Sequence, residues 1–156
     1  MTLYTDDAMM LAPGAPMAEG NAIRDGFAQM GGMGVTAIDL QTGDHAWMIA
    51  NGDTPAHVAE RLGLDPATRP RTGKASRAGL LVTRTLLFAG EGLSGDPVFR
   101  AHDKATGEIL AEIEIPGTQT GLPMTYLHEG RQFIVLSVGG RGMAPELVAL
   151  ALLPEA

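Results

Sequence analysis

The chain has 156 residues, enough for one domain of ordinary size and too few for two comfortable ones. Asp and Glu outnumber Lys and Arg by 18 to 11, so the net charge is −7, and this diffuse acidic balance argues against nucleic acid as a partner because such binding needs a basic footprint. Cysteine is absent, which excludes disulfides, thiolate metal sites and cysteine nucleophiles.

Residues 1–33 form an N-terminal segment whose pattern suggests a strand over 1–7, a loop over 8–20 and a short helix over 21–30. The first 20 residues contain no Lys or Arg, so the basic start of a signal peptide is missing. The longest apolar runs, such as 147–153, fall far short of the roughly 20 residues that span a bilayer. We therefore expect no signal peptide and no transmembrane segment in this chain.

Strand patterns dominate from residue 34 onward, and 21 Gly with 10 Pro favour many turns over long helices. One short helix is predicted over 54–62, with Thr54 as its cap and Pro55 in its first turn, inside a proline-rich insertion at 51–77. The apolar segment 146–153 is either a last strand or a short buried helix. The predicted hairpins are 34–40 with 45–50, 79–82 with 86–89, 98–103 with 108–115, and 123–127 with 132–138.

Two of these hairpins share a sequence pattern. In each, an Asp can accept hydrogen bonds from the turn backbone, Thr does so more weakly, Gly supplies a positive φ, and a preceding Ala is small enough to pack against another sheet. The pattern is interpreted either as a blade repeat of about 40–50 residues, lengthened by the insertion, or as two unrelated hairpins that share a common turn. The matching positions are Ala37, Asp39, Thr42 and Gly43 in the first copy and Ala101, Asp103, Thr106 and Gly107 in the second.

The first copy continues to Trp47 and resembles the tryptophan docking motif of the quinoprotein dehydrogenases, in which the Trp stacks between blades of an eight-bladed propeller. The second copy has Ala111 where that motif has Trp. Residues 121–126 and 130–135 resemble the last-blade signature of the family, and residues 139–142 its closing loop. Residues 51–55, 77–83 and 87–91 are similar to the membrane-associated glucose and quinate dehydrogenases that depend on pyrroloquinoline quinone (PQQ).

The resemblance implies an all-β fold made of antiparallel four-stranded sheets of the β-propeller blade type. We expect about two blades of a partial, eight-bladed quinoprotein propeller over 34–156, with one short helix in the insertion at 51–77, after the segment 1–33. At about 40–50 residues per blade the chain holds at most about three blades. A propeller needs at least about four blades, so we expect this chain to be a part of a larger protein.

The implied activity is that of an oxidoreductase acting on CH–OH groups, with PQQ as cofactor and Ca²⁺ beside it in the full-length enzyme. No segment matches the family's catalytic base or metal ligands, so no catalytic residue and no metal ligand is assigned. Asp96 matches a position at the cofactor mouth, and Arg141 stands where the glucose dehydrogenases carry a substrate-binding His. Arg141 would favour a carboxylate-bearing substrate such as quinate. The alternatives are a loop-capping Asp96 and a solvated Arg141.

The leading hypothesis is a C-terminal propeller fragment that oxidises a polyol, sugar or cyclic hydroxy acid only together with the remaining blades. The second is a non-enzymatic β-propeller module for binding or assembly, which would cover its open sheet edges by self-association. The third hypothesis is that the chain comes from a truncated reading frame. The resemblance places the enzyme in the periplasm or on the periplasmic face of the inner membrane.

Overall fold

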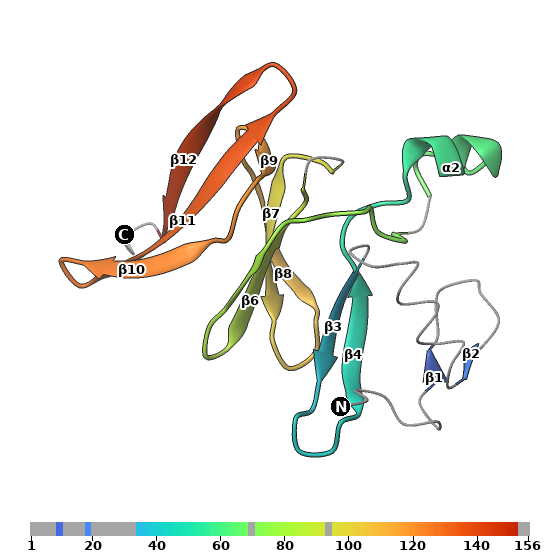
Figure 1. Cartoon of the computed structure of the whole chain (residues 1–156), viewed down its shortest axis with the longest axis horizontal. Helices are drawn as coiled ribbons and strands as arrows, with labels where there is room; N and C mark the ends of the chain where they lie inside the picture. Colours follow the sequence, from blue (N-terminus) through green and yellow to red (C-terminus); the bar gives the residue numbers. More distant parts are fainter. Residues whose placement is uncertain (1–8, 11–17, 20–33, 69–70, 93–94, 153–156) are drawn as a thin grey trace. The chain divides into compact units, whose positions relative to one another are not determined.

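The computed structural model describes residues 9–10, 18–19, 34–68, 71–92 and 95–152. The chain divides into two compact units, Met1–Ala75 and Ser76–Ala156, which are described separately below (Figure 1). The predicted strand over 1–7 and helix over 21–30 lie outside the described residues. Between them, within the predicted loop, β1 (Met9–Met10) pairs antiparallel with β2 (Ala18–Glu19).

The first unit contains the hairpin predicted around the turn at 41–44. Strand β3 (Gly34–Ile38) pairs antiparallel with β4 (His45–Ala50), with one register shift between Ala37 and Ile38. The chain then forms the short helix α2 (Ala56–Arg61). The insertion therefore carries a helix where the sequence predicted one.

The predicted cap of this helix is wrong. The N-cap residue is Pro55, and no side chain caps the helix. Thr54 is buried, and its hydroxyl accepts a hydrogen bond of 3.0 Å from the Thr72 hydroxyl instead. The sequence pattern predicted a hydrogen bond from the helix backbone to the Thr54 hydroxyl, whereas Thr72, at the far end of the insertion, donates to that hydroxyl.

Further contacts join the two ends of the insertion. The Gly73 N–H donates to the Gly52 carbonyl at 3.0 Å, and the Lys74 N–H donates to the Asn51 carbonyl at 3.0 Å. An ion pair joins Arg71 Nε to Asp53 Oδ1 at 3.3 Å. The insertion thus leaves and returns at neighbouring points, so the helix it carries need not disturb the strands.

The second unit begins with a four-stranded antiparallel sheet. Its strands β5 (Leu80–Val82), β6 (Leu86–Gly90), β7 (Val98–Asp103) and β8 (Ile109–Glu114) are neighbours in chain order. Such a four-stranded meander is the blade unit of a propeller. The all-β, antiparallel blade architecture expected from the sequence is confirmed here.

A second antiparallel sheet follows. The long strand β11 (Arg131–Gly140) pairs with β12 (Met143–Ala151) on one side. On its other side it pairs with β10 (Met124–His128) along its first half and with β9 (Thr118–Gln119) along its second half. The sheet is therefore three strands wide, and pairing with β11 makes the last apolar segment a strand and not a helix.

The core of the second unit lies between its two sheets. Phe99 of β7 packs with Ile115, Leu136 and Val138, all of them buried, and its ring lies 5.9 Å from that of Phe88. Successive residues of a strand point to opposite faces, so Arg100 points away from this core. Among the described residues, no helix is long and apolar enough to cross a bilayer.

Candidate functional site

The turn of the β3–β4 hairpin is held by its own side chains. Asp39 Oδ1 accepts hydrogen bonds from the backbone N–H groups of Gln41 at 2.7 Å and Thr42 at 3.3 Å. The Thr42 hydroxyl accepts one from the Asp44 N–H at 3.2 Å. Gly43 has a φ of 82°, in the left-handed region that favours glycine.

The β7–β8 hairpin repeats the same bonds. Asp103 Oδ1 accepts from the N–H groups of Ala105 at 2.7 Å and Thr106 at 3.0 Å, and the Thr106 hydroxyl accepts from the Glu108 N–H at 3.2 Å. Gly107 has a φ of 78°. Two turns that agree in sequence thus agree in conformation, as either a blade repeat or a shared turn motif would give.

The agreement extends to the strand pairing. Ala37 lies opposite Trp47, Ala101 lies opposite Ala111, and a register shift follows the Ala in each hairpin. Trp47 is half-buried, whereas Ala111 is exposed. The structure therefore places Ala111 at the position that Trp47 holds in the first copy, and the docking role of Trp47 stays a prediction.

Asp96 lies on the loop between β6 and β7. Its side chain is exposed, its carbonyl accepts a hydrogen bond from the Val98 N–H at 2.8 Å, and its own N–H donates to Glu91 Oε2 at 2.8 Å. Its backbone is thus fixed on both sides while its carboxylate remains accessible to solvent. Arg141, also exposed, lies in the turn between β11 and β12.

A chain of contacts places these two residues at the same end of the two sheets. Asp96 bonds to Glu91, whose carbonyl accepts the Gln119 N–H at 3.0 Å. Gln119 in turn pairs with Val138 near the end of β11, just before the turn that carries Arg141. Asp96 and Arg141, 45 positions apart in the sequence, thus lie in loops at the same end of the two sheets.

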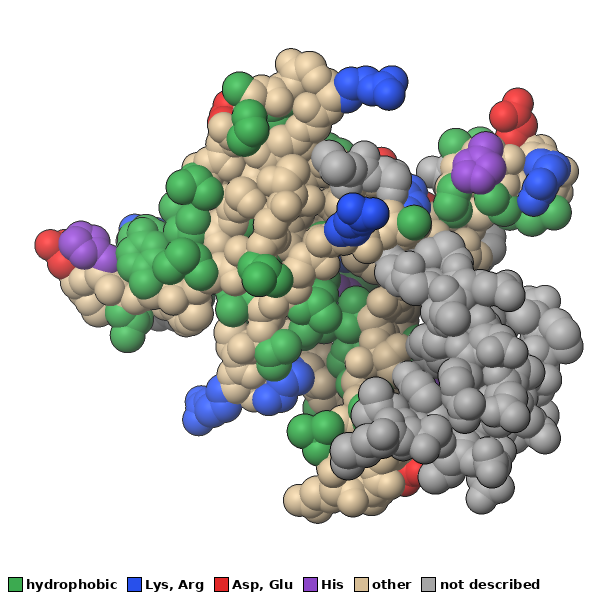
Figure 2. Space-filling model, viewed as in Figure 1, with side chains coloured by type: hydrophobic (Ala, Val, Ile, Leu, Met, Phe, Trp, Pro, Cys, Tyr) green, Lys and Arg blue, Asp and Glu red, His purple; other side chains and the backbone are tan. Residues whose placement is uncertain are grey.

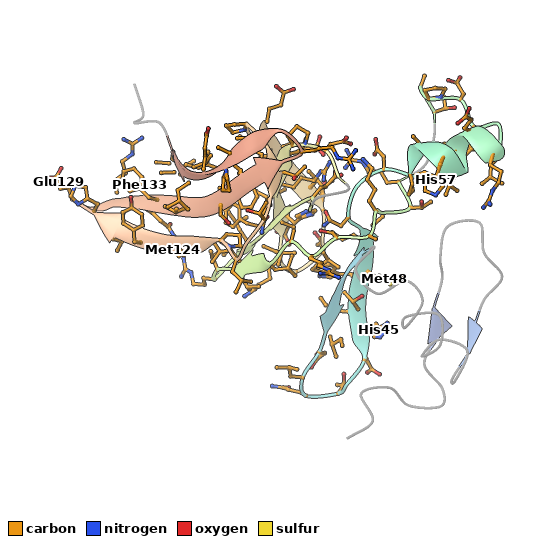
Figure 3. The ribbon with its side chains drawn as sticks, turned by 45° about the horizontal axis from the view of Figure 1, so that its top comes forward. His45, Met48, His57, Met124, Glu129 and Phe133 are labelled. Carbon is orange, nitrogen blue, oxygen red and sulfur yellow. The ribbon has the colours of Figure 1, made fainter. Side chains whose placement is uncertain are left out.

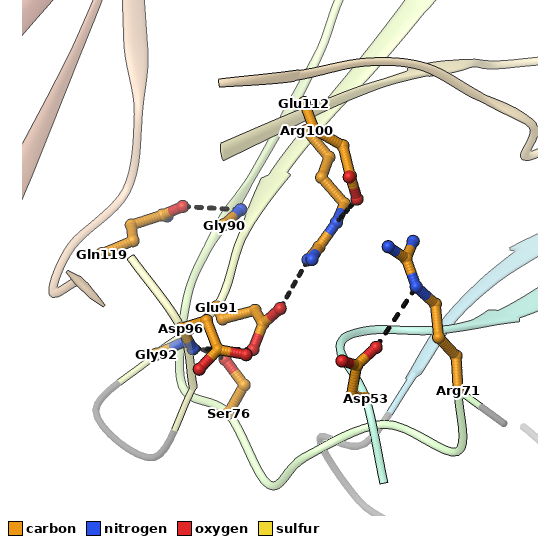
Figure 4. A network of polar contacts seen from close by, with 10 residues as sticks. All are labelled: Asp53, Arg71, Ser76, Gly90, Glu91, Gly92, Asp96, Arg100, Glu112 and Gln119. Atoms are coloured by element: carbon orange, nitrogen blue, oxygen red, sulfur yellow. Dashed lines mark hydrogen bonds and ion pairs between the residues drawn. The ribbon is translucent and has the colours of Figure 1, made fainter. Parts of the chain in front are cut away.

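Beneath Asp96 lies a charged network that sequence reasoning missed (Figure 4). The Arg100 guanidinium is held between two carboxylates, with Nη1 2.7 Å from Glu91 Oε1 and Nε 2.6 Å from Glu112 Oε1. The side chains of Arg100 and Glu91 are only 6% and 1% exposed, whereas that of Glu112 is 42% exposed. Burial alone would lower the pKa of Arg100, but hydrogen bonds to Glu112 and Glu91 and their charges outweigh it, so this pKa is raised.

Gln119 was also missed, and it joins the two sheets. Its amide oxygen accepts the Gly90 N–H at 2.9 Å, and its amide nitrogen donates to the carbonyls of Gly79 at 2.7 Å and Gly121 at 2.6 Å. A Cβ on Gly90 would overlap the Gln119 amide, so glycine is required there. For the Arg100 network the available signal was weak: one arginine between the apolar residues Phe99 and Ala101 of β7.

The two exposed side chains at this end can bind polar groups of opposite kinds. The Arg141 guanidinium suits a carboxylate group, and the Asp96 carboxylate suits a cation or a hydroxyl donor. In the part of the chain that the structure describes, no group of three or more His, Asp or Glu residues is placed to hold a metal ion.

Comparison with known proteins identifies relatives of one kind. The chain is 31% identical over 148 residues to the glycerol dehydrogenase large subunit of Gluconobacter thailandicus, a match covering 82% of this chain and 20% of that protein. It is 29% identical over 127 residues to the quinoprotein glucose dehydrogenase of Escherichia coli K12, covering 76% and 15% respectively. The chain thus spans a fifth or less of the length of these relatives.

One solved structure and one family profile also match this chain. A crystal structure of quinohemoprotein alcohol dehydrogenase from Comamonas testosteroni matches with a TM-score of 0.49 and 23% identity, covering 79% of this chain and 18% of that one. The profile of the PQQ family described as "Glucose/ethanol/alcohol dehydrogenase, beta-propeller domain" matches residues 32–134, more than half of the chain. The chain therefore belongs to the β-propeller domain family of the PQQ-dependent dehydrogenases.

Proposed function

We propose that this chain supplies the last blades of a PQQ-dependent dehydrogenase that oxidises a polyol, a sugar or a cyclic hydroxy acid. The observation that carries the proposal is the location of Asp96 and Arg141 at one end of two successive antiparallel sheets. In this proposal they form one wall of the quinone pocket, and the remaining blades supply the other walls. The chain would work in the periplasm or on the periplasmic face of the inner membrane.

PQQ, when bound, supplies the group that accepts a hydride from the substrate carbon. The residues of this chain have other tasks. The Arg141 guanidinium pairs with a carboxylate on the substrate, which favours a hydroxy acid over a neutral sugar. Asp96 faces the mouth of the pocket as a fixed negative charge. The catalytic base and the Ca²⁺ ligands come from the remaining blades, so the isolated chain is inactive.

Exposed apolar side chains support a need for further blades. On the second sheet Met124 is 55% exposed, Leu127 73% and Leu147 78%. Figure 2 shows hydrophobic side chains gathered over β10, and Figure 3 shows Met124 and Phe133 on its hairpin with Glu129 near the tip. Apolar patches and open sheet edges of this kind mark surfaces that another element covers.

A chimaera tests the proposal. This chain replaces the matching segment of the Escherichia coli quinoprotein glucose dehydrogenase, and dye reduction is measured with PQQ and Ca²⁺. We expect turnover by the chimaera and none by the isolated chain, and Arg141→Gln should reduce turnover of a hydroxy acid more than that of glucose. The matched control is Arg84→Gln, which removes an exposed arginine from the β5–β6 turn. A folded chimaera without turnover contradicts the proposal, as does turnover by the chain alone.

The same exposed apolar residues favour one other function, a non-enzymatic module that assembles with copies of itself. Size-exclusion chromatography with light scattering separates the two. A defined oligomer that does not bind PQQ supports the assembly module, whereas a compact monomer counts against it.

A further inference from the structure

The carboxylate of Glu91 connects the buried charge network to the loop that carries Asp96. Oε1 lies 2.7 Å from Arg100 Nη1, and Oε2 accepts the Asp96 N–H at 2.8 Å (Figure 4). The two oxygens of one side chain thus serve two different partners. From this geometry we propose that Glu91 is a positioning residue that fixes the Asp96 loop, and that Arg100 holds Glu91 in place for this task; the functional consequence rests on the function proposed above.

The surroundings of Glu91 leave its side chain little freedom. It is 1% exposed, and its own backbone is tied to both sheets, since its N–H donates to the Val98 carbonyl at 3.4 Å and its carbonyl accepts the Gln119 N–H at 3.0 Å. Arg100, the partner of its carboxylate, extends from the middle of β7 and is held from the other side by Glu112. The Glu91 carboxylate is therefore held by an arginine that is part of the four-stranded sheet.

The loop itself is shaped to lie over Glu91. The Gly95 N–H donates to the Gly92 carbonyl at 2.7 Å, and a Cβ on Gly95 would overlap the Glu91 side chain. The Gly92 N–H is held by the Ser76 hydroxyl at 2.9 Å. A hydrogen bond to a charged acceptor is among the stronger ones in proteins, and burial strengthens it further. The Asp96 backbone is thus the point at which the loop is fastened to the sheet.

A matched pair of variants isolates this hydrogen bond. Glu91→Gln with Arg100→Met removes both buried charges but leaves an amide oxygen that can accept the Asp96 N–H. Glu91→Met with Arg100→Met removes the charges and the acceptor. Exchanging a buried ion pair for apolar groups of similar size is often close to neutral, so the Met–Met variant should fold. The Gln–Met variant keeps one uncharged amide that can bond to Asp96 and should fold as well. They differ at residue 91 in one side-chain amide, whose oxygen is the acceptor for the Asp96 N–H.

Amide hydrogen exchange of the full chain, followed by NMR, is the measurement. We expect the Asp96 N–H to exchange about tenfold faster in the Met–Met variant than in the Gln–Met variant, as the loss of one well-formed hydrogen bond implies. The amides of β7 and β8 should exchange equally in the two variants. Equal exchange at Asp96 would overturn the proposal, as would a difference spread evenly over β7 and β8, because Glu91 would then only stabilise the sheet.

A PQQ-binding experiment distinguishes the pocket role of Asp96 from the positioning role of Glu91. In the chimaera described above, Asp96→Asn should weaken PQQ binding, and the Met–Met variant should weaken it more than the Gln–Met variant. If Asp96→Asn leaves PQQ binding unchanged while the exchange difference at Asp96 is present, the pocket role of Asp96 is wrong and the positioning by Glu91 stands. If Asp96→Asn weakens PQQ binding but the Asp96 N–H exchanges equally in the Met–Met and Gln–Met variants, the pocket role of Asp96 stands and the positioning by Glu91 is wrong.

Discussion

Replacing Gln119 by Met is expected to destabilise the second unit strongly. Gln119 is 1% exposed, and its amide makes hydrogen bonds of 2.6–2.9 Å to the backbone of Gly79, Gly90 and Gly121. Methionine has nearly the same size and none of these bonds. Each bond contributes about 1 kcal/mol net, and a buried N–H left without a partner costs more, so the free energy of unfolding should fall by about 3 kcal/mol.

Urea unfolding of the full chain, followed by far-ultraviolet circular dichroism, measures this loss. The matched control is Gln132→Met, the same exchange on the same sheet, where the side chain is exposed and bonds only to the Thr125 hydroxyl. We expect the control to change stability by at most about 0.5 kcal/mol. The reasoning is refuted if Gln119→Met costs less than about 1 kcal/mol more than the control, because the three bonds would then be exchanged for water at no cost.

Two further predictions concern stability. Gly43 has a φ of 82° with open space around a Cβ, so Gly43→Ala should cost about 1 kcal/mol from backbone strain alone, whereas Gly140→Ala, equally open but without a positive φ, should cost less than half as much in thermal unfolding. The raised pKa of Arg100 means that the guanidinium side of its ion pairs with Glu91 and Glu112 is fully charged below the unfolded value, so on the alkaline side this contribution is lost only as the pH rises through the folded one. Because a free lysine titrates at about 10.4, Arg100→Lys should lose more stability near pH 10 than the wild type does; parallel pH profiles would argue against the network.

The hairpins show how far local sequence determines this protein. Asp39, Thr42 and Gly43 form their bonds within a few residues, so the turn could be predicted from its letters alone, and the second copy at 103–107 has the same conformation. Alternating apolar residues likewise predicted the strands of the four-stranded sheet β5–β8. The hairpin motifs were the basis of the resemblance to the quinoprotein dehydrogenases, which the family profile confirms.

Contacts between residues far apart in the sequence determine the parts of the fold that the sequence pattern did not predict. Strand β9 is too short to show a periodicity and exists because its backbone pairs with the end of β11. The Thr54 hydroxyl meets Thr72, 18 residues away, and so does not cap the helix. The last apolar segment is a strand because β11 lies beside it.

The candidate site divides in the same way. Sequence motifs singled out Asp96 and Arg141, because both stand in loops with recognisable neighbours. The residues beneath them were not singled out, since the Glu91–Arg100 ion pair and the Gln119 bonds to Gly90 and Gly79 join residues 9 to 40 positions apart. Turn chemistry acts through neighbours along the chain and can be read from the sequence alone. A buried charge or amide is stable only where distant residues meet it, and the tertiary structure alone decides that.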